Sequence, residues 1–353
     1  MAEWTRRSFG KGEIDRAGEL LVPWWSDYPK TLLDPESLGR AYSIVQNWRS
    51  SHAFPLNTFQ VSLRSRARRV QRDALVAQRL KRFSSVMDKL AREPHMKLSQ
   101  MQDLGGCRAI VADVHIVEEL VDLYRGTESM FFDAEGALKC YDYIKSPKPD
   151  GYRGVHVVGR YVPSSDKQEA WRGQRIEIQL RSRLQHAFAT AVETVTTFTR
   201  ERLKFGGGPT EWRRFFSLMG SAIALREGTA RVPGTPTDDS ELVRELGKAA
   251  RDLRIRQRLR GWSTALTVVR RRSIGKFRWL LLVLDMKANT IKVTGYADRQ
   301  KAASELAEIE KQPGDFDAVL VWVRSIKDLK AAYPNYYADT GEFLDALNRA
   351  VKG

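Results

Sequence analysis

The stretch Cys107–Gly126, CRAIVADVHIVEELVDLYRG, joins two kinds of apolar pattern within twenty residues. Its first part, Cys107–Val114, is a nearly continuous apolar run, which is typical of a buried strand. The second part, His115–Gly126, spaces its apolar residues as a helix does. A buried strand followed directly by a helix predicts an α/β protein.

Patterns on either side of this stretch extend the prediction. Further elements expected in the first part of the chain are a helix from about Phe59 to Arg92, strands at Val155–Val162 and Arg175–Arg181, and helices at Ser182–Lys204 and Glu211–Glu227. The expected class is α/β (α+β), with a mixed central sheet flanked by helices.

A stretch rich in Gly, Pro and polar residues, Gly228–Ser240, is typical of a linker. Elements expected beyond it are a basic helix at Glu241–Leu259, strands at Lys276–Met286 and Thr290–Tyr296, a helix at Asp298–Lys311, a strand at Asp317–Val323 and a last helix from Asp339. The predicted division is an N-terminal helical segment (1–58), a catalytic domain (59–228), a linker (229–240) and a smaller C-terminal α/β module (241–353).

The charge is unevenly distributed along the chain. Lys and Arg number 59 against 43 Asp and Glu, which gives a net charge of +16. Residues 60–100 hold eleven Lys/Arg against three Asp/Glu, and residues 244–278 hold twelve against two. Two basic blocks on an otherwise nearly neutral chain indicate a polyanionic partner such as nucleotide phosphates or RNA. Two solvated helix faces would give the same pattern.

Other features exclude several classes of protein. The two cysteines lie in no CxxC or Cys/His cluster, which argues against a disulfide framework and a structural zinc site. No apolar run is long enough to cross a membrane, and the first residues lack a secretory signal. We therefore expect a cytoplasmic protein without a membrane partner.

The strand Arg175–Arg181 carries a one-sided polar row. Alternation places Glu177, Gln179 and Arg181 on one face and apolar side chains on the other. Asp103 precedes the strand that begins near Cys107 and stands two residues before a Gly-Gly pair. Alone, the row fits a half-exposed strand and the glycines fit an ordinary turn.

Cations surround these acids in the sequence. They are Arg79, Lys81 and Arg82, together with Lys145 and Lys148 in the stretch DYIKSPKPDGYRGVH (Asp142–His156), and Arg108 enters the strand. Two acids able to hold Mg²⁺ among several Lys/Arg fit a nucleoside triphosphate site. No GxxxxGK[ST] loop or GxGxxG fingerprint is present, so side chains would have to hold the phosphates.

Four ordered motifs carry a resemblance to a known family. RLKRFSSVMDKL, QDLGGCRAIV, DYIKSPKPDGYRGVH and IEIQLRSRLQHAFATAVE occur in the order and spacing of the RelA/SpoT-type alarmone synthetase domain, a nucleotidyl pyrophosphokinase. The wider chain, including AYPNYYADTGEFL, resembles the single-chain toxin–antitoxin branch of CapRel-like proteins. The resemblance implies a nucleotidyltransferase-like fold and transfer of the β,γ-pyrophosphate of ATP to a ribose 3′-hydroxyl.

The resemblance also implies roles for individual residues. Arg79, Lys81 and Arg108 would hold ATP, and Lys145 and Lys148 would meet phosphates. His156 would be a catalytic residue together with Asp103 and Glu177. Asp103 and Glu177 would bind Mg²⁺. Tyr152 would stack on the acceptor base, Gln179 and Arg181 could orient the acceptor, and Glu193 would support the site. The general base could be Glu177 or a metal-bound oxygen.

Two acceptors stay open. A guanosine nucleotide (GDP or GTP) would give the alarmone (p)ppGpp, whereas pyrophosphorylation of the tRNA 3′ end would block translation. The charge in residues 60–100 exceeds the need of one ATP and favours tRNA. The C-terminal module would then restrain a toxin, with a phage protein as a possible trigger. A non-catalytic RNA-binding protein on the same scaffold is a further alternative.

Overall fold

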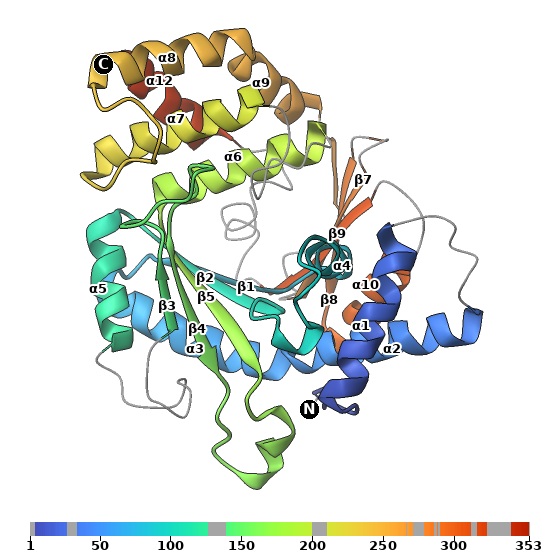
Figure 1. Cartoon of the computed structure of the whole chain (residues 1–353). Helices are drawn as coiled ribbons and strands as arrows, with labels where there is room; N and C mark the ends of the chain where they lie inside the picture. The colour runs from blue at the N-terminus through green and yellow to red at the C-terminus, as the bar shows by residue number, and fades with distance from the viewer. Residues whose placement is uncertain are drawn as a thin grey trace.

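The computed structural model describes residues 4–26, 34–125, 139–199, 210–265, 267–270, 279–285, 288, 290–311, 316–322 and 340–352. The strands are β1 (Leu75–Leu80), β2 (Gly105–Val111), β3 (Lys139–Asp142), β4 (Val155–Arg160), β5 (Arg175–Ser182), β6 (Thr267–Arg270), β7 (Trp279–Asp285), β8 (Thr290–Tyr296) and β9 (Phe316–Trp322). They form one sheet in the order β3-β4-β5-β2-β1-β9-β7-β8-β6 (Figure 1). The pairs β2–β5 and β6–β8 are parallel and the others are antiparallel, so the predicted mixed sheet is confirmed.

Helices flank this sheet, as expected. They include α1 (Lys11–Ser26), α2 (Pro35–Ser51), α3 (Ala53–Val70), α4 (Phe83–Arg92), α5 (Val114–Arg125), α6 (Arg183–Thr199), α7 (Thr210–Glu227), α8 (Asp239–Asp252), α9 (Ile255–Ala265), α10 (Arg299–Lys311) and α12 (Gly341–Lys352). Within the described ranges, none of these helices is long and apolar enough to span a membrane.

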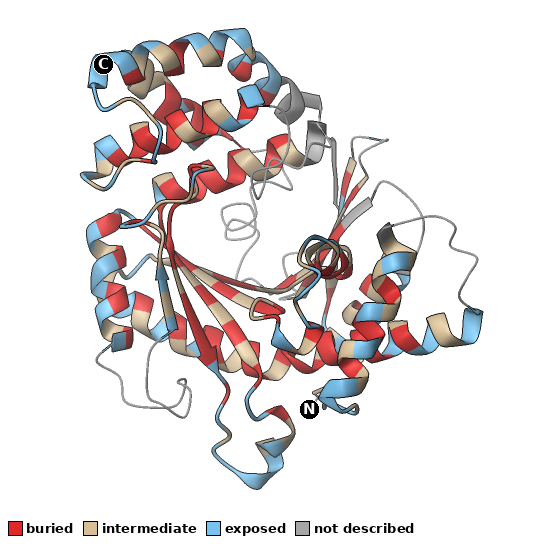
Figure 2. Ribbon diagram, in the orientation of Figure 1, coloured by how far each residue is buried: buried red, intermediate tan, exposed pale blue. Residues whose placement is uncertain are grey.

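One face of the strands β1, β2, β4 and β5 is apolar and packs against α3 and α5. Side chains such as Ala109 of β2 and Ile178 of β5 are at most 1% exposed there, beside Phe59 and Leu63 of α3. Buried residues follow these strands in Figure 2. Because side chains alternate along a strand, the opposite face is left for polar residues.

The helices α6 and α7 lie on the other side of the sheet from α3 (Figure 1). Phe188 of α6 and Phe215 and Phe216 of α7 are buried in a second core with α8 and α12. The C-terminal helices thus support α6 and α7 from outside.

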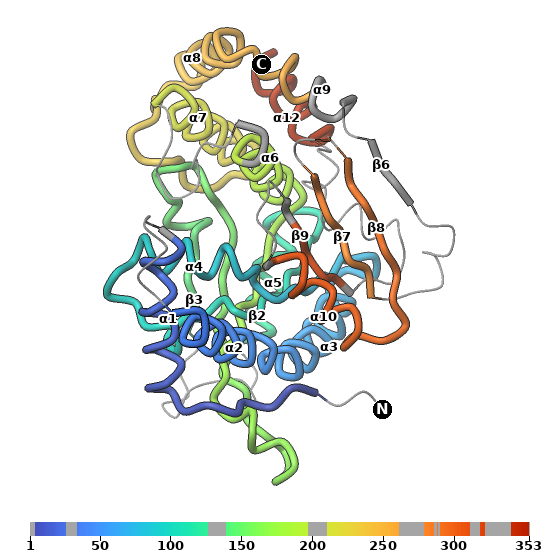
Figure 3. Tube along the Cα trace, turned by 90° about the vertical axis from the view of Figure 1, so that its right-hand side faces the viewer, coloured from blue at the N-terminus to red at the C-terminus, as the bar shows by residue number. Residues whose placement is uncertain are grey.

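The strands of the C-terminal part extend the same sheet (Figure 3). The ladder between β1 and β9 is short, with the pairs Gln78–Trp322 and Arg79–Val321. The division of the chain at residues 229–240 stays a prediction.

Two expected helices are wrong. The span from Phe59 to Arg92 contains the end of α3, the strand β1 and α4, because its apolar residues belong to three elements. The span Glu241–Leu259 is broken between α8 and α9, where Arg254 has a φ of 50°. The expected ends at Lys204 and Asp339, and residues 332–339 of AYPNYYADTGEFL, lie outside the described residues.

Candidate active site

A cavity of about 500 Å³ lies on the polar face of the sheet, below α6 and α7 and beside α4. It is lined by nearly all the predicted site residues: Arg79, Lys81, Asp103, Arg108, Lys148, Tyr152, His156, Glu177, Gln179, Arg181 and Glu193. The strand registers explain this gathering, since Arg79 and Glu177 both stand opposite Gly106 of β2. The predicted one-sided polar row of β5 therefore forms the floor of the cavity.

Asp103 lies between two ammonium groups. Its Oδ2 is 2.8 Å from Lys81 Nζ and its Oδ1 is 3.1 Å from Lys89 Nζ. Burial opposes ionisation, but the two lysines outweigh it and lower the pKa of Asp103 to about 2. The site therefore holds a carboxylate that is charged at any physiological pH.

A closed ring of hydrogen bonds joins five side chains on the sheet. Glu177 accepts from His156 Nδ1 at 2.9 Å and from Gln179 Nε2 at 2.6 Å. Arg181 donates to Gln179 Oε1 at 2.7 Å and to the Tyr152 hydroxyl at 2.8 Å. A contact of 2.6 Å between the Tyr152 hydroxyl and His156 Nε2 closes the ring. The donor and acceptor roles of the two His156 ring nitrogens depend on the tautomer of the ring.

The ring sets the charge of its members. Burial opposes ionisation of Glu177, but His156 and the hydrogen bond from Gln179 outweigh it and lower the pKa of Glu177. Burial raises the pKa of Tyr152 to about 12, although Arg181 acts in the other direction. Glu177 is thus a carboxylate and Tyr152 a neutral phenol at neutral pH.

The loop between β3 and β4 presents Tyr152 as the sequence predicts. Asp150 accepts a hydrogen bond from the Tyr152 amide at 3.0 Å, and Gly151 has a φ of +86°. A Cβ at Gly151 would lie 2.4 Å from the carbonyl oxygen of Phe216, so only glycine fits this close approach. The loop is therefore seated on α7.

Lys148 of this loop lies between two aromatic rings. Its Nζ is 4.2 Å from the centroid of the Tyr143 ring and 5.4 Å from that of the Tyr152 ring. Cation–π contacts of this kind hold a charged group in place while leaving its hydrogens for a ligand.

Lys145 and Arg82 are the predicted cations that do not line this cavity. The Lys145 side chain is 66% exposed, and its Nζ is 3.9 Å from Asp142 on the same turn. Glu193 of α6 does reach the cavity, where it lies 4.0 Å from Arg79.

Lys89, Tyr143 and Arg213 are among the cavity residues that sequence reasoning missed. Lys89 follows Lys81 by eight positions, and its pairing with Asp103 could not be foreseen while both lysines were placed on one helix. Tyr143 stands inside the quoted stretch Asp142–His156, where a second aromatic ring near the lysines was the available signal. Arg213 of α7 lies outside the sequence stretches that carry the resemblance.

Comparison with known proteins identifies part of the chain. Residues 78–201 match the model of a family described as "Region found in RelA / SpoT proteins". These residues are therefore similar to that family, and residues 78–201 are called the RelA/SpoT region. It contains every one of the predicted site residues, from Arg79 to Glu193.

A curated relative matches a shorter stretch of the chain. The GTP pyrophosphokinase YwaC of Bacillus subtilis (strain 168) is 30% identical over 86 residues, which cover 23% of this chain and 38% of that protein. The match thus spans little more than a third of the length of this relative.

Solved structures are also similar to the chain. The small alarmone synthetase 1 of Bacillus subtilis bound to its product pppGpp is 19% identical, and the match covers 55% of this chain and 94% of that one at a TM-score of 0.43. A GTP pyrophosphokinase family protein of Streptococcus pneumoniae is 22% identical, with 58% and 92% covered at a TM-score of 0.39.

Proposed function

We propose that the chain is an ATP-dependent pyrophosphokinase that transfers the β,γ-pyrophosphate of ATP to a ribose 3′-hydroxyl. The observation that carries this proposal is the cavity in which Asp103 and Glu177 stand among Lys81, Lys148 and Arg108. In this reaction the 3′ oxygen bonds to the β-phosphorus, the bond from that phosphorus to the α,β-bridging oxygen breaks, AMP leaves, and the hydroxyl loses its proton. Negative charge grows on the phosphate oxygens, and fixed cations stabilise it.

The donor set fits Mg²⁺. Asp103 and Glu177 are both held ionised, and the described part of the chain contains no larger cluster of metal-binding side chains. Mg²⁺ is typically held by one or two carboxylates together with substrate phosphates and water. An ion held by these two residues would neutralise charge on the phosphate oxygens.

The side chains of the cavity would divide the remaining work. In the structure, Lys81 and Lys89 neutralise Asp103. From these positions they would also contact the phosphates of bound ATP. Lys148, held by its two aromatic neighbours, and Arg108 would neutralise the transferred group. Glu177 is a charged carboxylate and is our candidate for accepting the proton of the 3′-hydroxyl.

For the acceptor, we propose the 3′ end of tRNA. Arg68 and Arg69 at the end of α3 and Arg72 after it are exposed, and they supply positive charge beyond what the cavity needs for ATP. Tyr152 would stack on the terminal base, a contact worth about 1–3 kcal/mol in single-stranded nucleic acid sites.

A guanosine nucleotide is the second candidate. Two observations favour it: α3 packs on the face of the sheet opposite the cavity, and the curated relative is named a GTP pyrophosphokinase. Such an acceptor would use Tyr152 in the same way and would not need the surface of α3.

One experiment tests the reaction and the acceptor together. The full chain is incubated with Mg²⁺ and with α- or γ-labelled ATP, in the presence of tRNA, GDP or GTP. We expect γ-label on the acceptor and AMP from the α-label. ADP in place of AMP would indicate simple phosphoryl transfer and contradict the proposal, and the labelled acceptor decides between tRNA and the guanosine nucleotide.

Matched variants link this activity to the cavity. Asp103→Asn and Glu177→Gln should each lower the rate by roughly 100-fold or more, because each removes a charged group at the reacting phosphates. Asp122→Asn, whose side chain is 68% exposed on α5, should leave the rate unchanged. An Asp103→Asn protein with all its cellular effects intact would instead support the non-catalytic RNA-binding alternative.

We also propose that residues 241–353 restrain a toxic activity, as in the CapRel-like branch, and that a phage protein releases the restraint. The support is the position of β9 directly beside β1, whose Arg79 lines the cavity. A variant that loosens this docking, such as Glu310→Gln on α10, should slow growth on induction, and Asp103→Asn in the same chain should abolish the effect. Equal growth with and without Glu310→Gln, at equal amounts of folded protein in the cell, contradicts the restraint.

A further inference from the structure

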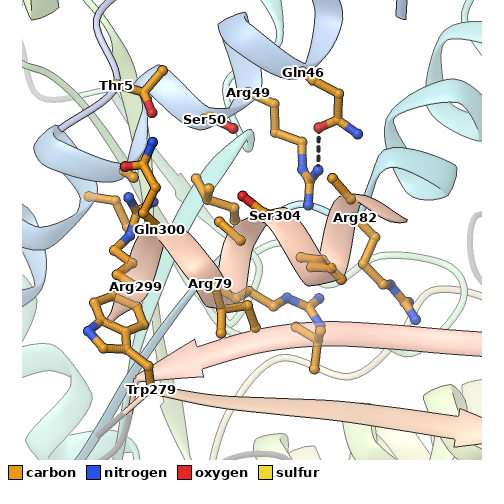
Figure 4. Close-up of a pocket in the computed structure, with 18 of the residues that line it drawn as sticks. Thr5, Gln46, Arg49, Ser50, Arg79, Arg82, Trp279, Arg299, Gln300 and Ser304 are labelled. Carbon is orange, nitrogen blue, oxygen red and sulfur yellow. Dashed lines mark hydrogen bonds between the residues drawn. The ribbon is translucent and has the colours of Figure 1, made fainter. Parts of the chain in front are cut away.

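A second cavity, of about 200 Å³, lies where three parts of the chain meet (Figure 4). The N-terminal segment contributes Thr5, the end of α2 contributes Arg49 and Ser50, and α10 contributes Arg299 and Ser304. This cavity lies against β1 and β9, so its walls come from both the RelA/SpoT region and the C-terminal strands.

The lining of this cavity is strongly basic. It includes Arg49, Arg79, Arg82 and Arg299 and, in the described ranges, no carboxylate. Arg49 is balanced from behind by Glu310, with its Nη1 2.8 Å from Oε2. A positive cavity without acids of its own favours an anionic ligand.

Arg299 is the cavity cation whose charge is not balanced by a carboxylate in the described part of the chain. Its guanidinium lies 4.9 Å from the centroid of the Trp4 ring and 5.5 Å from that of Trp279, and it has no carboxylate within ion-pair distance in the described part of the chain. Burial lowers the pKa of Arg299 to about 10, and the charge of Arg49 adds to this shift. Two indole faces hold the side chain, and neither neutralises it.

Neutral polar groups complete the cavity. The side chains of Thr5, Ser50, Gln300 and Ser304 are drawn around Arg299 and Arg49 in Figure 4. Hydroxyl and amide groups can donate hydrogen bonds to ligand oxygens that the guanidinium groups leave free.

We propose that this cavity binds a small phosphoryl anion, such as inorganic phosphate, pyrophosphate or a small phosphate ester. A guanidinium presents two parallel N–H groups that match the oxygens of a phosphate. A doubly charged phosphate offsets several guanidinium charges better than a single carboxylate does. The volume is below the roughly 300 Å³ at which pockets for larger ligands begin, so an intact nucleoside triphosphate does not fit.

This site is separate from the candidate active site and goes beyond the proposed function. The two cavities share only Gln78 and Arg79 of β1, and the remaining lining residues differ. A bound anion would contact Arg299 of α10 and Arg49 of α2 together. It would therefore tie α10 of the C-terminal part to α2.

Calorimetric titration of the full chain, without ATP, tests the proposal. The probes are inorganic phosphate and pyrophosphate, with malonate as a carboxylate of equal charge. We expect both phosphoryl anions to bind and malonate to bind at least about tenfold more weakly. The variant Arg299→Gln should weaken phosphate binding at least about tenfold, since it removes a charge-assisted contact.

Further variants distinguish phosphate binding in this cavity from phosphate binding elsewhere on the protein. Gln300→Glu places a carboxylate in the lining at a helix start, where it is tolerated, and should also weaken phosphate binding. Two control variants should change the affinity for phosphate by less than about twofold. They are Lys301→Gln, which replaces an exposed cation of α10, and Lys148→Gln, which replaces a cation that lines only the larger cavity. Absence of binding at millimolar phosphate, unchanged binding in Arg299→Gln or Gln300→Glu, or malonate binding as tight as phosphate overturns the proposal.

Discussion

Lys145 and Lys148 lie three positions apart in the loop between β3 and β4, but their surroundings differ sharply. Lys148 is held between the rings of Tyr143 and Tyr152 at the cavity, whereas Lys145 points to solvent. Lys148 therefore holds its charge where a phosphate would bind, and Lys145 does not. Lys145 and Lys148 therefore make a matched pair for testing the site.

Replacing these lysines in turn should give unequal results. We expect Lys148→Gln to lower kcat/KM for ATP by about 10–100-fold, because it removes a cation next to the transferred group. Lys145→Gln should change it by less than about twofold, since an exposed charge is screened by solvent. Steady-state kinetics of the two variants check this, and equal losses would contradict the assignment of Lys148.

Glu227, at the end of α7, is a carboxyl group whose burial works against its charge. It accepts hydrogen bonds from the Ser182 hydroxyl and from Gln185 Nε2, which lower its pKa, but burial outweighs them and raises the pKa overall. The folded protein thus holds the Glu227 proton more tightly than the unfolded chain does. This contribution to stability is complete below the usual pKa of a glutamate and is lost as pH rises through the raised pKa.

The variant Glu227→Gln should remove that dependence. We expect the free energy of unfolding of the unmodified chain to fall, relative to that of Glu227→Gln, between about pH 3.5 and about pH 8, by about 1.4 kcal/mol for each unit of the pKa rise. Urea unfolding at the two pH values measures the difference. Glu211→Gln, at the exposed start of α7, is the control and should run parallel to the unmodified chain; a flat difference for Glu227→Gln would contradict the prediction.

At the scale of elements, α7 and the loop that presents Tyr152 meet through two glycines. A Cβ at Gly220 of α7 would lie 2.8 Å from both the Cα and the carbonyl oxygen of Gly151. Real Cβ atoms do not approach backbone this closely, so either the helix or the loop would have to move. The contact sets how far the loop reaches over the cavity.

Alanine substitution should show this contact. Gly220→Ala should lower the free energy of unfolding by about 1–3 kcal/mol and also reduce activity, because it displaces the loop. Gly39→Ala, in the exposed middle of α2 with nothing within 4 Å of the new Cβ, should raise stability by up to about 1 kcal/mol. Chemical unfolding and the label-transfer assay check both, and a Gly220→Ala protein as stable and active as the unmodified chain would contradict the contact.

The strands that the sequence marks clearly are those with one apolar and one polar face. β5 was recognised because its alternation is regular over Arg175–Arg181, and the cavity floor followed from the same pattern. β1 was not, because its six residues lie between two helices and their apolar members continue the spacing of the α4 stripe. Its neighbours β2 and β9 impose the extended form, and those contacts are far away in sequence.

The site was predictable where family motifs and alternation agreed. Asp103, Glu177 and Tyr152, which the motifs single out, line one cavity, while their roles stay predictions. The ring through His156 and the pairing of Lys89 with Asp103 were not predictable, because they depend on side-chain positions that no spacing fixes.

At the scale of the whole molecule, a buried ion pair joins α10 to α2. Arg49 is 4% exposed, and Glu310 contacts it with both carboxylate oxygens, at 2.8 and 3.2 Å. Glu310 also accepts a hydrogen bond from the amide of Phe83 at 3.1 Å, at the start of α4. One carboxylate therefore links three helices that are far apart in sequence.

Removing this carboxylate should destabilise the protein strongly. Glu310→Gln leaves the buried guanidinium of Arg49 without a counter-charge, and we expect a loss of about 3 kcal/mol in the free energy of unfolding. Glu305→Gln, exposed on the same helix, should change it by less than about 0.5 kcal/mol. Urea unfolding of the two variants checks this. Equal free energies of unfolding for Glu310→Gln and Glu305→Gln would show that the ion pair does not stabilise the contact between α10 and α2.

The short ladder between β1 and β9 has a consequence for how the protein can be handled. A chain cut before β9 would leave Gln78 and Arg79 of β1 without their partner strand and open this sheet edge fully. Such edges template strand pairing between molecules, so a fragment that ends before β9 should self-associate or precipitate where the full chain does not. Lysine substitutions on that edge, chosen away from the cavity, are the natural way to keep such a fragment monomeric.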